Sequence, residues 1–443
     1  MNSITIDPQL FINNRSRLQQ RLLPDSLVVV NSNDVMPTNA DGTLGFHQNA
    51  DLFYLTGIDQ EQTMLVLAPD AYDPNNREIL FIRQPSEHLA TWEGQKLSKQ
   101  QASEISGVKN VRWLSEFWEI FHVLMVESQH VYLNSNEHPR AQVVVESRDA
   151  RFIAECQRRY PLHDYRRLAR IMHELRSIKS PAEIELIRKA CRITRGGFLR
   201  ALRRISPGIN EADIHAEFAH EFIRSHARFA YPPIIAAGKN NCVLHYNANN
   251  QLCRNGELVL MDVAAAHAYY ASDLTRTVPV SGRFSRRQKQ VYNAVLRIFR
   301  ATVAQMKPGV LPRDLRKFAE QITEKELVDL GLITMRQLRR QDPQRPLVRK
   351  YFMHGVAHSL GLDVHDVAMA SEPFKPGYVL TCEPGIYIRE EGFGIRLEND
   401  ILITETGNED LMADVPIEAE QIEQLMKATP SRRGRTISTG PDA

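Results

Sequence analysis

The C-terminal half of this sequence repeats one order of helices and strands. In each copy, a helix that ends at a Pro-Gly pair is followed by a second helix, and further along by a strand hairpin with two carboxylates. The two helix pairs span about residues 180–224 and 286–330. The hairpin carboxylates are Asp262 and Asp273 in the first copy, and Glu383 and Glu398 in the second. Such a repeat predicts two similar halves, related by internal two-fold pseudo-symmetry, that face each other across one site.

The N-terminal part, up to about residue 175, follows a different pattern. Short apolar runs alternate there with helical patterns such as 114–128, in which apolar residues recur every three or four positions. This alternation predicts an α/β domain with a mostly parallel sheet. The apolar runs that we expect to form strands are 26–32, 63–69, 78–83 and 130–135.

A helix-start signal separates the two parts. Residues 180–183 (SPAE) form a capping box with proline at the first helical position, and apolar residues then recur on one face. We therefore expect an N-terminal domain over 1–176 and a second domain over 177–426. The remaining residues, 427–443, have no hydrophobic pattern and few basic residues, which favours a short flexible tail over a nucleic-acid-binding arm.

The composition argues against several classes of function. With 443 residues, the chain is too long for one small core and fits two or three domains. Its 55 basic and 53 acidic residues leave a formal charge of +2, which gives no strong attraction to nucleic acid or to an acidic membrane. We expect no signal peptide and no membrane span, because no apolar run approaches ~20 residues. Five cysteines without a CxxC pair favour reduced thiols and a cytoplasmic location.

Asp262 and Asp273 flank a predicted turn between two strands. Asp262 closes the apolar run ELVLMD, and Asp273 opens DLTRTVPV further along. If residues 264–270 turn the chain, the two strands pair and both carboxylates can meet on one face. Taken alone, such aspartates more often serve in turns or as helix caps.

Histidines and a further carboxylate follow in two later segments. The segment HGVAHSLGLDVHD holds His354, His358 and His365 close together, with glycines that allow the backbone to approach a ligand. A polar loop with incidental imidazoles is the alternative interpretation. Glu383 ends the apolar run of VLTCEPGIYI, where a charge is costly unless it is paired or bound to a metal.

Arg396 and Glu398 lie on one face of the strand predicted at GIRLENDILI, although a surface strand with a charged face would show the same pattern. Jointly, two Asp, one His and two Glu at strand ends form a set of hard ligands dominated by oxygen. Such a set suits Mn²⁺ or a similar divalent ion better than a structural zinc site. Two divalent ions would neutralise the four carboxylates, whereas one ion would leave an excess negative charge. The pattern therefore favours two metal ions.

These segments resemble the metal-site blocks of the pita-bread metallopeptidases. The similarity lies in LVLMDVAAAHAYYASDLTRT, MHGVAHSLGLDVHD, LTCEPGIYI and GIRLENDILITETGNEDL. Within that superfamily the chain is most similar to aminopeptidase P, the Xaa-Pro aminopeptidases, and HQNADLFYLTGID (47–59) is close to that family's N-terminal block of the type RQNSDFWYFTGF. The resemblance extends over roughly 1–425. It implies an N-terminal α/β creatinase-like domain and a C-terminal α+β pita-bread catalytic domain.

The resemblance also implies a role for each motif residue. The expected ligands of two divalent ions, Mn²⁺ above all, with Co²⁺ or Zn²⁺ as alternatives, are Asp262, Asp273, His358, Glu383 and Glu398. Asp273 and Glu398 would bridge the ions, and Glu383 would also shuttle a proton. The other expected catalytic or substrate-binding residues are His245, His354, His365, Tyr387 and Arg396. The implied reaction is hydrolysis of the N-terminal Xaa-Pro bond of peptides with proline in the second position.

The sequence departs from the family pattern at a few positions, and none of them is an expected ligand. The family usually has glycine at Ala264, Glu-Tyr at Ala266-His267, often a smaller residue at Ser272, and arginine at His47. Prolidase, which shares the fold and metals but cleaves only dipeptides, is the nearest alternative. Methionine aminopeptidase lacks the N-terminal domain, and inactive scaffold relatives usually lack ligands. By the same resemblance we expect a homo-oligomer, either a dimer or a tetramer.

Overall fold

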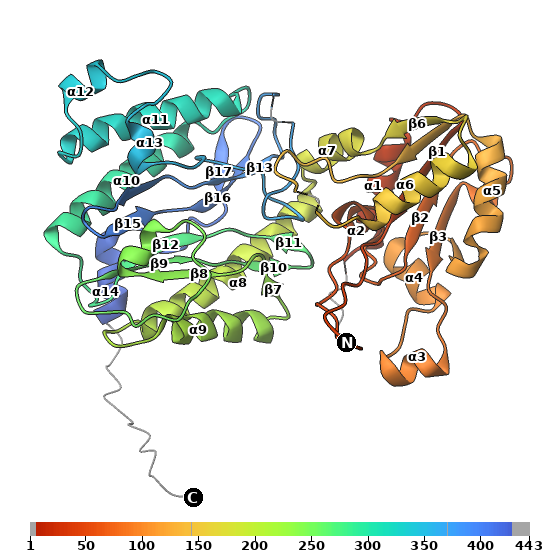
Figure 1. Ribbon diagram of the computed structural model, residues 1–443, viewed down its shortest axis with the longest axis horizontal. Coiled ribbons are helices and arrows are strands. Elements are labelled where there is room, and N and C mark those ends of the chain that lie inside the picture. Colours follow the sequence, from red (N-terminus) through yellow and green to blue (C-terminus); the bar gives the residue numbers. More distant parts are fainter. Residues whose placement is uncertain (1–5, 143, 370, 428–443) are drawn as a thin grey trace, which may run out of the picture. The chain divides into compact units, whose positions relative to one another are not determined.

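The computed structural model describes residues 6–142, 144–369 and 371–427, and the chain divides into two compact units (Figure 1). The first unit comprises Met1–Ala182 with Asp366–Met369, and the second comprises Glu183–His365 with Ala370–Ala443. Within the described ranges, no helix combines the length and the apolar character that a bilayer crossing requires. Of the tail expected over 427–443, Lys427 is the last residue of a helix, and residues 428–443 lie outside the described residues.

A six-stranded sheet forms the centre of the first unit. Its strand order is β4-β3-β2-β1-β5-β6. The strands are β1 (Ser26–Asn31), β2 (Met64–Leu67), β3 (Glu78–Ile82), β4 (Asn110–Trp113), β5 (His130–Leu133) and β6 (Asp164–Arg167). Each of the four apolar runs predicted as strands forms one. Their inward side chains, such as Val29 and Phe81, share a core with Phe117 and Phe121.

The direction of β2 differs from the sequence-based prediction. β2 is antiparallel to both β1 and β3, whereas the other pairs in this sheet are parallel. The link 68–77 between β2 and β3 holds only a short 3₁₀ turn, Pro74–Asn76. A parallel crossover needs about a dozen residues or more, usually with a helix. The sheet is therefore mixed rather than mostly parallel.

The helices of the first unit lie before, between and after these strands in the sequence. They are α1 (Pro8–Gln19), α2 (Ala50–Thr56), α3 (Glu87–Trp92), α4 (Lys99–Ser106), α5 (Phe117–Glu127), α6 (Arg148–Arg159) and α7 (Ala169–Ser177). The predicted helix over 114–128 consists of a 3₁₀ turn, Leu114–Glu116, followed by α5. Phe117 and Phe121 of α5 pack inward, whereas Trp118, Val123 and Val126 of the same helix are exposed.

A short segment from late in the sequence, Asp366–Met369, belongs to this first unit. The carboxylate of Asp366 forms ion pairs with Arg176 at 2.5 Å and with Lys179 at 3.2 Å. Arg176 also contacts Asp51 at 2.8 Å. All four side chains are largely buried, so their opposite charges compensate one another in place of solvent.

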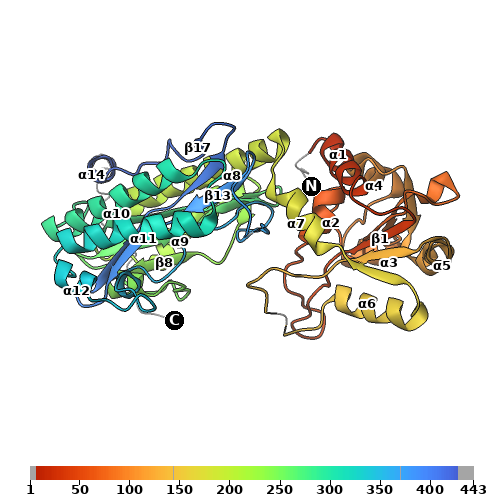
Figure 2. The ribbon, with the colours of Figure 1, turned by 90° about the horizontal axis from the view of Figure 1, so that it is seen from above.

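In the second unit the strands lie between two pairs of helices. Figure 1 shows α10 (Arg286–Gln305) and α11 (Pro312–Asp329) on one side, and α8 (Pro181–Arg204) and α9 (Glu211–Arg224) on the other. In Figure 2, seen from above, α10 and α11 lie over the strands. These bounds agree with the predicted helix pairs to within a residue. The shorter helices are α12 (Met335–Arg339), α13 (Val348–Tyr351) and α14 (Ala419–Lys427).

The strands of the second unit repeat one arrangement in its two halves. In the first half, β9 (Leu258–Asp262) pairs antiparallel with β12 (Thr275–Pro279), and the small hairpin β10–β11 (Ala265–His267, Tyr270–Ala271) is inserted between them. In the second half, β13 (Val379–Cys382) pairs antiparallel with β16 (Asn399–Ile403) around the hairpin β14–β15 (Gly385–Ile388, Phe393–Arg396). The internal repeat predicted from the sequence is therefore present.

This arrangement places the four carboxylates at equivalent points of the two halves. Asp262 ends β9, and Asp273 lies between β11 and β12. Glu383 directly follows β13, and Glu398 lies between β15 and β16. The predicted turn at 264–270 thus contains a hairpin of its own. The remaining strands are β7 (Arg228–Phe229), β8 (Ile234–Ala237) and β17 (Asn408–Asp410).

A β-bridge joins the two halves at the site. Thr275 pairs with Glu398, and the Glu398 N–H donates to the Thr275 carbonyl at 3.1 Å. Because Thr275 lies two residues after Asp273, and Glu398 is itself one of the four carboxylates, the bridge brings the strand ends of both halves together.

Candidate metal centre and active site

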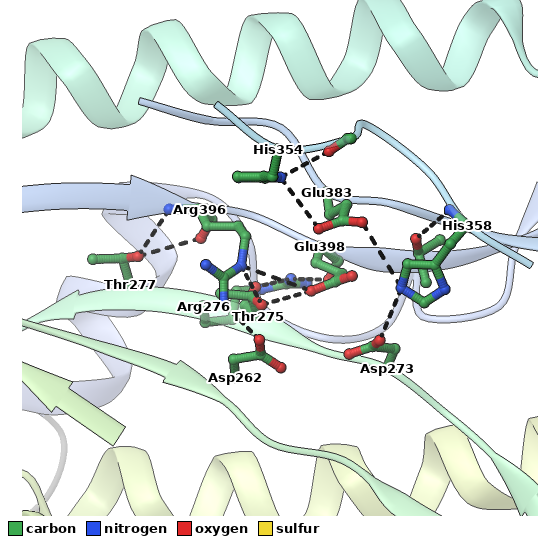
Figure 3. Close-up of polar contacts among 12 residues, drawn as sticks. Asp262, Asp273, Thr275, Arg276, Thr277, His354, His358, Glu383, Arg396 and Glu398 are labelled. Atoms are coloured by element: carbon green, nitrogen blue, oxygen red, sulfur yellow. Dashed lines mark hydrogen bonds and ion pairs between the residues drawn. The ribbon is translucent and has the colours of Figure 1, made fainter. Parts of the chain in front are cut away.

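Four carboxylates and one imidazole converge between the strand ends of the second unit. Figure 3 shows Asp262 and Asp273 from the first half facing Glu383, Glu398 and His358 from the second. Asp273, His358 and Glu398 each offer one ligand atom, and these atoms lie within 4.8 Å of one another. Two atoms bound to one cation at ~2.2 Å can be at most ~4.4 Å apart, so the three are nearly at ligand spacing.

The imidazole of His358 is oriented toward the carboxylates. Its Nδ1 lies 3.0 Å from the carbonyl of Ser359, which identifies Nδ1 as the protonated nitrogen in the neutral ring. Its Nε2 lies 3.4 Å from Asp273 Oδ2 and 3.8 Å from Glu383 Oε1. The lone pair of Nε2 is therefore directed into the carboxylate cluster, as a metal ligand requires.

Asp262 has one oxygen that the protein leaves unpaired. Its Oδ2 accepts a hydrogen bond from Arg396 Nη2 at 2.5 Å. Its Oδ1 is buried and has no hydrogen-bond partner among the described residues. A buried carboxylate oxygen without a donor is unfavourable unless a cation or another group compensates it.

Burial and the neighbouring negative charges oppose ionisation of Glu383 and Glu398 in this cluster. Burial raises the pKa of Glu383 to about 7, although His358 and Arg396 oppose this shift. Burial and the neighbouring carboxylates Asp273, Glu383 and Asp262 hold the pKa of Glu398 well above its usual value. Burial lowers the pKa of His358, but the hydrogen bond to Asp273 and the charge of Glu383 outweigh it and raise the pKa to about 9. Divalent cations would supply the charge that these protons supply otherwise.

A hydrogen-bonded chain connects Arg396 to His354. Arg396 Nη1 donates to the Tyr387 hydroxyl at 2.8 Å, and this hydroxyl lies 2.8 Å from His354 Nε2. His354 Nδ1 lies 2.7 Å from the Gly355 carbonyl and 3.5 Å from Glu383 Oε2. Burial and the nearby Arg396 lower the pKa of His354 to about 3, so its ring is neutral. The Tyr387 hydroxyl therefore donates to Nε2.

His365 and His245 are less enclosed than the residues above. Both side chains are exposed. The ring of His365 lies edge-on to that of His358, with 4.3 Å between their centres. His245 follows the 3₁₀ helix Gly238–Cys242, and its charge contributes to the lowered pKa of His354. The structure thus brings His365 to the cluster and His245 into the electrostatic range of His354.

Sequence reasoning missed Tyr231 and Thr275, which hold the two expected bridging carboxylates. The Tyr231 hydroxyl donates to Asp273 Oδ1 at 2.6 Å. The Thr275 hydroxyl donates to Glu398 Oε2 at 2.6 Å and accepts from Arg396 Nε at 3.0 Å. The DLTRT motif contains Thr275 and could have suggested it, because period-2 alternation places it on the same strand face as Asp273. No local signal marks Tyr231.

The departures from the family pattern have simple local environments. Ala264 is fully buried, and its carbonyl accepts from the Ala230 N–H at 2.9 Å. His267 is buried on β10, where burial lowers its pKa. The Ser272 hydroxyl donates to the Ala265 carbonyl at 2.8 Å and lies 2.8 Å from the Thr194 hydroxyl. His47 is an exposed residue of the first unit.

Comparisons with known proteins agree with both units. Residues 185–405 match metallopeptidase family M24, and residues 11–132 match the aminopeptidase P N-terminal domain. The Xaa-Pro aminopeptidase of Escherichia coli K12 is 35% identical over 442 residues, which cover 96% of this chain and 98% of that protein. Xaa-Pro aminopeptidase 3 of Homo sapiens is 34% identical over 417 residues, which cover 90% and 81% of the two chains.

Solved structures give the same result for the fold. Zinc-substituted aminopeptidase P of E. coli in complex with product has a TM-score of 0.86 and 34% identity, and the match covers 97% of this chain and 100% of that one. An E. coli aminopeptidase P variant in complex with substrate has a TM-score of 0.85 at 34% identity, and covers 96% and 99%. The fold expected from the resemblance, an N-terminal α/β domain and a C-terminal pita-bread domain, is confirmed.

Proposed function

The chain belongs to the Xaa-Pro aminopeptidases of metallopeptidase family M24, and on this premise we propose that it hydrolyses the N-terminal Xaa-Pro bond of peptides. The products would be the free first residue and a peptide that begins with proline. The arrangement of the carboxylates supports the site assignment above all. Asp273 and Glu398, from opposite halves, have ligand atoms within 4.8 Å of one another and of His358, and a buried oxygen of Asp262 has no hydrogen-bond partner among the described residues. Such a cluster has the chemistry of a divalent metal centre.

The proposed ligands are those expected from the motifs. They are Asp262, Asp273, His358, Glu383 and Glu398. Two divalent ions would balance the four carboxylates, and the oxygen-rich set favours Mn²⁺ over Zn²⁺. When bound, the cations would activate a water molecule for attack and polarise the carbonyl of the scissile bond. Asp273 and Glu398 would be shared between the two ions.

Two features of the substrate explain why such a site suits proline. The Xaa-Pro bond is a tertiary amide whose nitrogen has no hydrogen to donate, and proline restricts the residue before it. Peptidases that bind substrates as an added β-strand rely on backbone donors of this kind. A site that polarises the carbonyl with cations does not need the missing donor.

The chain's own residues would move the proton and stabilise the transition state. Glu383, one of the carboxylates of the cluster, is also proposed to carry a proton to the leaving nitrogen of proline. His365, exposed next to His358, is proposed to donate to the developing oxyanion, a contribution of about 3 kcal/mol. The chain from Arg396 through Tyr387 would keep His354 neutral and fixed beside Glu383. His245 and His354 would then line the part of the site that receives proline.

Two further proposals concern the location of the enzyme and the assembly of its chains. We propose a cytoplasmic enzyme, because the five cysteines are all buried and unpaired. We also propose a homodimer or homotetramer by analogy with the family. Gel filtration with light scattering would test the oligomeric state.

A substrate series tests the proposed reaction. The chelated protein is supplied with Mn²⁺, Co²⁺ or Zn²⁺ and assayed on Arg-Pro-Pro, N-acetyl-Arg-Pro-Pro and Arg-Ala-Pro, with products read by mass spectrometry. We expect release of arginine from Arg-Pro-Pro alone, with the highest rate in Mn²⁺. Acetylation removes the terminal charge and should prevent cleavage. Equal rates on the acetylated or alanine peptides would contradict the proposal, and turnover of Gly-Pro but not of Gly-Pro-Pro would favour prolidase activity.

A further inference from the structure

A fifth carboxylate, Asp400, lies next to the candidate metal centre without being one of its proposed ligands. It belongs to β16 and is two residues beyond Glu398. Its side chain is fully buried. Oδ2 accepts a hydrogen bond from the Asp273 N–H at 3.0 Å, and the Cys191 thiol on α8 lies 3.5 Å away as a second donor. Oδ1 has no hydrogen-bond partner among the described residues.

The contact between Asp400 and the Asp273 N–H lies at a point where the main chain of the first half is not part of a β-strand. Residues 272–274 lie between β11 and β12 and are not part of a strand. The Ser272 N–H donates to the Ala265 carbonyl, and the Leu274 carbonyl accepts from the Val263 N–H. Between these backbone contacts, the N–H of Asp273 is held by a side chain of the other half. Asp400 thereby fixes the backbone from which one proposed bridging ligand projects.

The side chain of Asp273 is held separately, by Tyr231. Main chain and side chain of this ligand thus have independent supports, one from each half of the unit.

We propose that Asp400 is a positioning residue for metal binding, which sets the backbone of Asp273 so that the ligands of the two halves meet at metal-binding distance. The proposal rests on the proposed function, because it presumes that Asp273 is a ligand. Groups that orient metal ligands typically change metal affinity 10- to 100-fold when they are replaced. A residue that only fills the core would change the stability of the metal-free protein and leave the affinity of the folded protein unchanged.

The test measures Mn²⁺ binding to the full-length chelated protein by titration calorimetry, together with the thermal unfolding of the metal-free form. Asp400→Ala should weaken Mn²⁺ binding about 10- to 100-fold, and Asp400→Asn, whose amide oxygen can still accept, should weaken it less. Asp410→Asn is the matched control, because Asp410 is a nearby carboxylate on β17 whose hydrogen bonds go to Asn399 and the Met412 N–H. Its affinity should stay within about twofold of the wild type.

Two results would overturn the proposal: wild-type Mn²⁺ affinity in both Asp400 variants, or an equal loss of affinity in Asp410→Asn. If Asp400→Ala fails to fold, Asp400→Asn decides by the same criterion. Asp273→Ala distinguishes this failure from a failure of the proposed function. If Asp273→Ala loses Mn²⁺ while both Asp400 variants bind it normally, only the positioning role is wrong. If Asp273→Ala binds two Mn²⁺ ions normally, the site assignment itself is wrong.

Discussion

Removal of the metal should make the stability of the second unit depend on pH. In the metal-free protein, burial raises the pKa of Glu383 from 4.5 to about 7, against the charges of His358 and Arg396. The folded state therefore binds this proton more tightly than the unfolded chain does, and ionisation of Glu383 destabilises the fold as pH rises from 4.5 through 7. The difference between 4.5 and about 7 corresponds to about 3 kcal/mol at pH above 7.

His358 acts in the same direction at higher pH. Its pKa in the folded metal-free protein is raised to about 9 because Asp273 and Glu383 outweigh the effect of burial. Its contribution to stability is complete below the unfolded pKa of about 6.5 and is lost as pH rises through 9. Bound divalent cations would replace both protons, so the loaded protein should lack these two dependences.

The assay follows urea-dependent hydrogen exchange of peptides from 379–403 at pH 5, 7 and 9, with and without Mn²⁺. Tryptophan fluorescence gives an internal control, because Trp92, Trp113 and Trp118 all lie in the first unit. Glu383→Gln is the matched variant. It removes the titrating group, so between pH 5 and 7 the stability of the metal-free variant should change by about 2 kcal/mol less than that of the metal-free wild type. Identical pH profiles of the two metal-free proteins would refute the reasoning.

Four substitutions, with a fifth as a control, test the remaining assignments. Asp273→Ala or Glu398→Ala should abolish peptidase activity and reduce bound metal below two ions per chain, because each is proposed to bridge; elemental analysis and the Arg-Pro-Pro assay check this. His365→Ala should keep its metal but lower kcat/KM by ~10²-fold, as loss of one oxyanion donor does, and a parallel loss of metal would show that His365 is a ligand. Thr275→Val removes the hydroxyl that Glu398 and Arg396 Nε share, so it should cost about 1–3 kcal/mol in urea unfolding and weaken Mn²⁺ binding. Thr277→Val is the control. Among the described residues the Thr277 hydroxyl bonds to the Arg396 main chain, so this substitution should not weaken Mn²⁺ binding.

Helix bounds and the internal repeat were predictable because their signals are local. The Pro-Gly pairs stop α8 and α10, and Asn210 and Ser285 cap the helices that follow them in sequence. A carboxylate at the end of an apolar strand also stands out, since burial of a charge is costly without a partner. For these reasons the sequence alone led to the strand ends at which the candidate ligands lie.

Other features depend on pairs of residues that are far apart in the sequence. The direction of β2 follows from the short link to β3, whereas an alternating pattern of apolar runs is the same for either direction. The role of Tyr231 depends on its contact with Asp273, and that of Thr275 on its contact with Glu398. No local signal marks Tyr231, and the alternation that places Thr275 on the strand face of Asp273 does not reveal its contact with Glu398.

The sequence by itself determined which residues could bind metal, because hard ligands at strand ends are visible one strand at a time. Only the tertiary structure decided how they are held. Asp400 reads in the sequence as one more acidic residue of the GIRLENDILI segment, yet its carboxylate contacts the Asp273 backbone of the opposite half. The physical reason is that hydrogen bonds act over about 3 Å in space, whatever the separation along the chain, and folding alone brings such donors and acceptors together.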